Sequence, residues 1–143
     1  MYWRSWLKER PLIDAGTRGH AVILTPCTEG AYLNFPQSVQ LDVPGQKEHV
    51  MTLRDTYAIP MTRPEITGGQ EPLILGGQGN LWGEYINCDK NAEYMLFPRL
   101  CALAEAFWTP ENLRCFDDFN RRLPEHRRRL ESLGILQHRD ALI

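Results

Sequence analysis

The sequence lacks three features that would place it at once in a broad functional class: a long apolar run, an excess of one charge, and closely paired cysteines. Its apolar runs, such as residues 21–24 and 73–75, are too short to cross a bilayer, so we expect no membrane segment. A formal charge of −2 gives no basis for binding nucleic acid. Metal-ligand spacing is missing among the four cysteines, and we expect neither a metal nor another cofactor; they are Cys27, Cys88, Cys101 and Cys115.

What is present is a series of short apolar runs that alternate with helical patterns, which predicts βα units of an α/β protein. Residues 1–3 indicate the end of a strand, and residues 20–25 (HAVILT) and 72–75 indicate strands buried on both faces, as in a parallel sheet. The glycines after residue 75 allow close backbone approach. Between these strands, residues 26–69 are mostly irregular, with one helical turn at residues 51–57.

Three helices are predicted in addition. Residues 5–15 form the first, ended by Gly16 or Gly19. Residues 93–108 form an apolar helix that Pro98 kinks. A terminal amphipathic helix covers about residues 110–133, capped by Thr109, broken near Pro124 and ended by Gly134.

These few strands do not make an independent parallel sheet with both edges covered. A (β/α)8 barrel takes roughly 250 residues, whereas the chain has 143. We therefore interpret residues 1–143 as the C-terminal βα units of a TIM barrel, a partial barrel that needs a partner for its open edges.

Aromatic and polar side chains follow each apolar run. Trp3 follows the first, Tyr32 and Asn34 follow residues 20–25, and Trp82 and Glu84 follow residues 72–75. Because parallel strands of a barrel end on one face, we expect these side chains to converge there. Indole rings stack on the C–H face of a pyranose, and carboxylates and amides bind its hydroxyls, so the pattern indicates a sugar site.

Each of these residues also has a structural alternative. The tryptophans could pack in the core, Tyr32 could bond a loop carbonyl, and Asn34 could cap a turn. Glu84 could form a surface ion pair. Glu105, inside the apolar helix, is expected to be a buried carboxylate paired with an arginine such as Arg99.

Four ordered blocks carry a resemblance to a known family: YWRSW, GHAVILTP, AYLNFPQ, and GGQGNLWGEYI followed by EYMLFPRLCALAEAFWT. They resemble the end of the catalytic barrel of the family 20 glycoside hydrolases, the β-N-acetylhexosaminidases. The resemblance implies an enzyme that removes terminal N-acetylglucosamine or N-acetylgalactosamine from glycans. It also implies retention of configuration, with the sugar's own acetamido oxygen as nucleophile.

The resemblance assigns roles to individual residues. Tyr32 matches the tyrosine that holds the N-acetyl carbonyl, and Trp82 matches the wall of the terminal-sugar pocket. Glu84 matches the carboxylate that accepts hydrogen bonds from outer hydroxyls. Trp3 resembles a second wall, and Asn34 stands where the family has asparagine or aspartate, among its substrate-binding residues.

The chain departs from the family in that it has no adjacent Asp-Glu pair, and the arginine by which the N-terminal part of the family's barrel binds sugar hydroxyls is also absent. In the family that glutamate protonates the leaving oxygen and that aspartate orients the acetamido nitrogen. The nearest match, Asp117-Asp118, falls on the terminal helix. We therefore expect the chain alone to be inactive, and to associate either with the remainder of a barrel or with itself as a homo-oligomer. The alternative is a stand-alone carbohydrate-binding module without catalysis.

Overall fold

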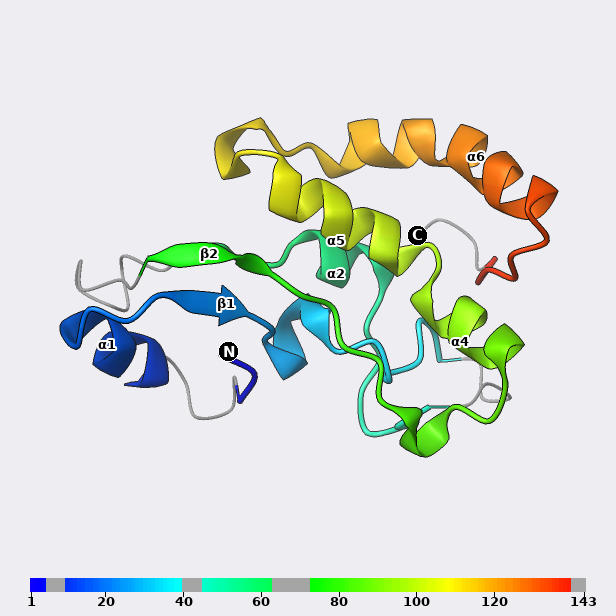
Figure 1. Cartoon of the computed structure of the whole chain (residues 1–143). Coiled ribbons are helices and arrows are strands. Elements are labelled where there is room, and N and C mark those ends of the chain that lie inside the picture. The colour runs from blue at the N-terminus through cyan, green and yellow to red at the C-terminus, as the bar shows by residue number, and fades with distance from the viewer. Residues whose placement is uncertain (5–9, 40–44, 63–72, 140–143) are drawn as a thin grey trace.

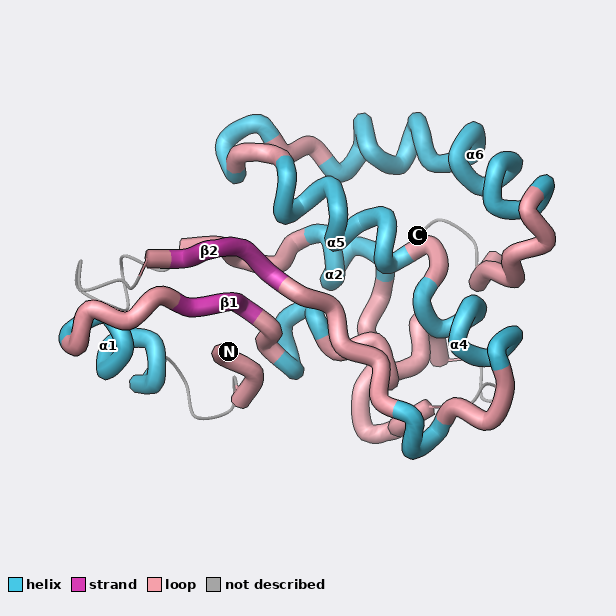
Figure 2. The backbone as a smooth tube through the Cα atoms, viewed as in Figure 1, coloured by secondary structure: helices cyan, strands magenta, loops and turns pink. Residues whose placement is uncertain are grey.

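The computed structural model describes residues 1–4, 10–39, 45–62 and 73–139, in which helices and parallel strands mix in one α/β unit (Figures 1 and 2). In chain order the elements are α1 (Arg10–Thr17), β1 (Val22–Leu24), the π-helical turn η2 (Cys27–Ala31), α2 (Leu53–Tyr57), β2 (Ile74–Gly77), the 3-10 turn η3 (Gly83–Tyr85), α4 (Asp89–Leu96), α5 (Arg99–Trp108), the 3-10 turn η4 (Glu111–Leu113) and α6 (Phe116–Ser132). Within the described ranges, no helix combines the length and the apolar character needed to span a membrane.

Three chain segments lie parallel in the order Tyr2, β1, β2. Tyr2 forms a parallel bridge with Leu24, and its amide donates to the carbonyl of Ile23 at 2.9 Å. On the other side of β1, Val22 pairs with Ile74. The carboxyl ends of all three segments therefore lie at one edge, as the alternating pattern predicted.

These strands are covered only in part. Val22 and Leu24 of β1 pack with Leu12 of α1, whereas Ile23 is 36% exposed and Leu75 is 65% exposed. The prediction of strands buried on both faces is therefore wrong for these residues, because α1 covers one side of the strands and α5 packs at the end of β2. The first predicted helix is confirmed in its second half as α1; residues 5–9 lie outside the described residues.

Helix α5 packs directly on the end of β2 because that strand ends in glycine. A Cβ atom on Gly77 would lie 2.2 Å from the ring of Phe107, and one on Gly79 would lie 2.7 Å from Leu103. The expected close backbone approach is confirmed. Together with Ala31 and Leu33 from the loop after β1, Leu103 forms a buried cluster behind that loop.

The predicted kinked helix at residues 93–108 is two helices. α4 begins at Asp89 and ends before Phe97, and α5 begins after a cis Phe97–Pro98 peptide bond. Proline has no amide hydrogen to continue the ladder of α4, so the chain turns there instead of bending. The predicted turn at residues 51–57 is confirmed as α2, whose start is closed by a capping box between Thr52 and Asp55.

The terminal helix differs from its prediction at Pro110 and at Pro124. Thr109 ends α5, and its amide donates to the backbone carbonyl of Glu105 at 2.9 Å. Helix α6 begins only at Phe116. Pro124 lies inside α6, where Phe119 and the neighbouring Leu123 pack against α2 and α5 and hold the helix together. The predicted stop at Gly134 is confirmed, with a positive φ of 71°. Figure 1 shows α6 above α5, on the side away from β1 and β2.

Candidate functional site

The loops after β1 and β2 run side by side beyond the sheet. Tyr32 and Asn80 form a parallel bridge, in which Leu33 donates its amide to the carbonyl of Asn80 and Asn80 donates to Ala31, each at 2.8 Å. The sequence-predicted residues on the two loops, Tyr32 and Trp82, are therefore brought to the same edge. Their convergence follows from the parallel strands that precede them.

Asn34 links the two loops through its side chain. It is fully buried, and its Nδ2 donates to the carbonyl of Trp82 at 2.7 Å while its Oδ1 accepts the amide of Trp82 at 2.6 Å. Both polar atoms of Asn34 thus hold the backbone of Trp82, whose indole remains 56% exposed. The geometry gives Asn34 a positioning function, and its direct contact with a sugar stays a prediction.

The phenol of Tyr32 is the hydrogen-bond donor of the site. It donates to Oε1 of Gln46 at 2.9 Å, and its ring packs edge-on against Phe35 with 4.8 Å between centroids. Burial raises the pKa of Tyr32 above its ordinary value of 10.0, followed by smaller effects of Cys27, Glu84 and other neighbours. The hydroxyl therefore stays protonated at neutral pH, where it can donate a hydrogen bond.

Glu84 and Trp3 complete the predicted set. Glu84 is exposed in η3, close enough to Tyr32 to raise the pKa of the phenol. Trp3 is 43% exposed, its carbonyl accepts the amide of Cys27 at 3.0 Å, and the guanidinium of Arg4 lies 4.9 Å from its ring centroid. In the part of the chain that the structure describes, no three His, Cys, Asp or Glu side chains cluster as metal ligands.

Comparison with known proteins decides the family of this arrangement. Residues 1–111 match the model of the glycosyl hydrolase family 20 catalytic domain. The chain belongs to glycosyl hydrolase family 20. It is 36% identical over 134 residues to a β-hexosaminidase of Porphyromonas gingivalis, covering 94% of this chain and 17% of that protein. Human β-hexosaminidase subunit beta is 39% identical over 69 residues, covering 48% of this chain and 12% of that protein.

The fold of the chain also resembles a solved family 20 structure. The exo-β-N-acetylglucosaminidase of Vibrio harveyi, in complex with N-acetylglucosamine, matches with a TM-score of 0.77 and 29% identity, covering 96% of this chain and 21% of that chain. The chain thus spans about a fifth of the length of these family members, or less.

Arg99 is a residue of the site's support that sequence reasoning assigned wrongly. Its side chain is fully buried and donates to four backbone carbonyls, at 2.7–3.0 Å: Leu33, Phe35, Met51 and Met95. Two of these carbonyls flank Asn34, so the guanidinium fixes the loop that carries Tyr32 and Asn34. Burial lowers the pKa of Arg99 to about 9, which leaves it charged at neutral pH. A charged residue inside an otherwise apolar helix is the sequence signal that could have identified it.

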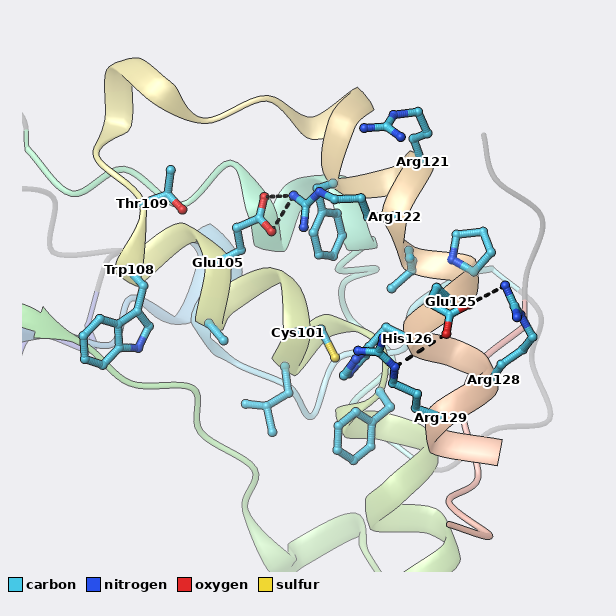
Figure 3. Close-up of a pocket in the computed structure, with 16 residues that line it drawn as sticks. Cys101, Glu105, Trp108, Thr109, Arg121, Arg122, Glu125, His126, Arg128 and Arg129 are labelled. Carbon is cyan, nitrogen blue, oxygen red and sulfur yellow. Dashed lines mark hydrogen bonds and ion pairs between the residues drawn. The ribbon is translucent and has the colours of Figure 1, made fainter. Parts of the chain in front are cut away.

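The expected partner of Glu105 is also corrected. Glu105 accepts two hydrogen bonds at 2.7 Å from Arg122 of α6 (Figure 3). The hydroxyl of Tyr57 also donates to Glu105, at 3.2 Å. Arg99 is turned inward and bonds only carbonyls among the described residues. The ion pair expected for Glu105 is confirmed with a different arginine, but the carboxylate is half-buried and not buried as expected.

Figure 3 shows the surroundings of this pair, a groove of about 990 Å³ between α5 and α6 with Trp108 89% exposed at its rim. A smaller hollow of about 320 Å³ lies beside Trp3 and α1. Neither of these two hollows is lined by Tyr32, Trp82 or Glu84. Trp82 and Glu84 are exposed, whereas Trp3 lines the smaller hollow.

The acidic pair Asp117-Asp118 is engaged in ion pairs. Asp118 accepts from Arg121 at 2.6 Å and from Arg122 at 2.8 Å, and these hydrogen bonds lower its pKa. Asp117 lies 3.6 Å from Arg54. A general acid needs a raised pKa rather than a lowered one, so Asp118 is unsuited to that role. Its two bonds lie within α6, whereas the ion pair of Asp117 joins α6 to α2.

Proposed function

We propose that this chain supplies one side of the N-acetylhexosamine pocket of a β-N-acetylhexosaminidase, as the C-terminal βα units of a (β/α)8 barrel. Family membership, the parallel order Tyr2, β1, β2, and the position of the site at the carboxyl ends of these segments support the proposal. The observation that carries it is the pair of hydrogen bonds by which Asn34 holds Trp82 on the edge that carries Tyr32.

Each site residue has a role in this proposal. The exposed indole of Trp82 stacks on the sugar ring, and Trp3 forms a second wall. Glu84 accepts hydrogen bonds from the outer hydroxyls, which a carboxylate binds more strongly than a neutral acceptor would. Tyr32 donates a hydrogen bond to the carbonyl of the 2-acetamido group, while Asn34 keeps Trp82 in place.

The reaction that this arrangement serves is substrate-assisted hydrolysis with retention. The acetamido oxygen attacks the anomeric carbon, the bond to the leaving oxygen breaks, and a general acid protonates that oxygen. Tyr32 limits the rotational freedom of the acetamido group and so lowers the entropy lost on the way to attack. The general acid must come from outside residues 1–143, because no Asp-Glu pair is present.

A chimaera tests the enzymatic proposal. The matched 134-residue segment of the P. gingivalis β-hexosaminidase is replaced by this chain, and hydrolysis of p-nitrophenyl N-acetyl-β-glucosaminide is measured. We expect Tyr32→Phe to lower kcat about 100-fold or more, as when one donor to a developing charge is removed. Trp82→Ala should raise KM, while Trp108→Ala, an exposed tryptophan outside the site, should change neither. Full activity of the Tyr32→Phe chimaera would refute the assigned role.

A stand-alone carbohydrate-binding module is the second candidate. It is favoured because the sequence has the amino acids predicted to bind a sugar but no Asp-Glu pair. Titration of the chain with a hexosamine-thiazoline, a mimic of the cyclic intermediate, separates the two by NMR. Shifts of the Trp82 indole and Tyr32 amide signals would support binding by the chain alone. A dispersed spectrum without shifts would mean that the pocket needs the rest of a barrel.

A further inference from the structure

Gln46 is bound to the same loop that carries Tyr32. Its amide donates to the carbonyl of Asn34 at 2.9 Å, and its side-chain Oε1 accepts the hydroxyl of Tyr32 at 2.9 Å. The preceding Gly45 has a φ of 137°, and a Cβ atom there would lie 2.6 Å from the carbonyl oxygen of Asn34. Only glycine permits this approach, so the backbone fixes the Gln46 side chain beside the phenol.

The group that Gln46 presents is chemically the same as the group that Tyr32 is proposed to bind. A glutamine side chain ends in a carboxamide, and a 2-acetamido sugar carries an amide carbonyl of the same kind. A phenol has a single O–H proton, so it makes one well-aligned hydrogen bond as donor at a time. The two amide carbonyls therefore compete for one donor.

We propose that Gln46 occupies the Tyr32 hydroxyl in the free site, is displaced by the acetamido carbonyl of the sugar, and so lowers the affinity of the site for acetamido sugars. This inference rests on the proposed function of Tyr32. Exchange of one amide for another restores the lost hydrogen bond, whereas a sugar with a hydroxyl in place of the acetamido group has no carbonyl to offer. Such a sugar leaves the Gln46–Tyr32 bond intact and gains nothing from the phenol.

The consequence is that Gln46 weakens the binding of acetamido sugars by the strength of its own bond to Tyr32. The net worth of one hydrogen bond corresponds to about a two- to tenfold change in affinity. Gln46→Met keeps the length of the side chain and removes the acceptor, so it should tighten binding by this factor. Gln46→Glu supplies a charged acceptor that holds the phenol more strongly, so it should weaken binding.

The test is a calorimetric titration with N-acetylglucosamine of the chimaera described above, in which the pocket is complete. Opposite effects of Gln46→Met and Gln46→Glu support the inference, because a purely structural role of Gln46 would make both variants bind more weakly. Glucose is the matched ligand, and its affinity should not change in either variant. In a Tyr32→Phe background, both Gln46 substitutions should lose their effect.

Two failures are distinguishable. If N-acetylglucosamine does not bind the active chimaera, or if Tyr32→Phe leaves its affinity unchanged, the proposed function of the site fails and the inference falls with it. If Tyr32→Phe weakens binding but Gln46→Met does not tighten it, the proposed function stands and the competition by Gln46 is refuted.

Discussion

Replacing Arg99 by methionine tests whether the buried guanidinium holds the site loop. Methionine has a similar length and no donors, so the substitution removes four hydrogen bonds at once and leaves their carbonyls without this donor. Two of them, from Leu33 and Phe35, lie on either side of Asn34. The perturbation therefore acts on stability and on the position of the loop together.

The structure gives the size of the effect. Hydrogen bonds from a charged donor contribute about 1.5–3 kcal/mol each. Against this, burial lowers the pKa of Arg99 from 12.5 to about 9, which corresponds to a desolvation cost of about 5 kcal/mol at about 1.4 kcal/mol per pH unit. Four such bonds outweigh that cost, and we expect Arg99→Met to lower the free energy of unfolding by about 4 kcal/mol, as when a buried ionic network is broken.

Arg99→Lys discriminates between charge and geometry. Lysine keeps the buried charge and its desolvation cost, but its three donors on one nitrogen cannot span four separate carbonyls. We expect it to destabilise at least as much as methionine. Urea unfolding followed by circular dichroism measures both, with Arg121→Met as control, since that exposed ion pair is worth less than about 1 kcal/mol. A lysine variant within about 1 kcal/mol of the parent would refute the reasoning.

Three further predictions follow from packing and exposure. Gly77→Ala should lower stability by about 2–3 kcal/mol in urea unfolding, because its Cβ would overlap α5, whereas Gly83→Ala, with nothing within 4 Å, should be nearly neutral. Burial raises the pKa of Cys101 from 9.0 to about 11, so at pH 8 its thiolate fraction is about 100-fold below that of a thiol with the ordinary pKa. Mass spectrometry should therefore show slower alkylation of Cys101 than of the exposed Cys88. The uncovered strand face should make the chain dimeric or larger in light scattering, and Leu75→Lys should reduce this; a monodisperse monomeric parent would contradict it.

The convergence of the site could be predicted from the sequence because it depends on local patterns. Apolar runs that end in polar or aromatic residues predict strands, and parallel strands bring their carboxyl ends to one edge. That reasoning placed Tyr32 and Trp82 together, and the bridge between Tyr32 and Asn80 agrees with it. Glycines after the second run likewise predicted the close packing of α5, because a missing Cβ is visible in the sequence.

The supporting contacts could not be predicted in this way, because they join residues far apart in the chain. Arg99 bonds a carbonyl 66 residues away, and the partner of Glu105 lies on a helix that the sequence placed too early. The misplaced start of α6 has a similar cause. Thr109-Pro110 has the composition of a helix start, but tertiary packing of Phe119 and Leu123 decides where the helix runs.

The buried contacts also explain why the exposed residues of the site can be arranged at all. Trp82 is held by Asn34, and Asn34 lies between the two carbonyls, of Leu33 and Phe35, that Arg99 fixes from α5. The position of an exposed indole on the β2 loop is therefore set by a charge buried in a helix that follows it in the chain. Since none of these supporting groups has to face solvent, the exposed side chains that we propose to bind the sugar do not themselves have to hold the loop in place.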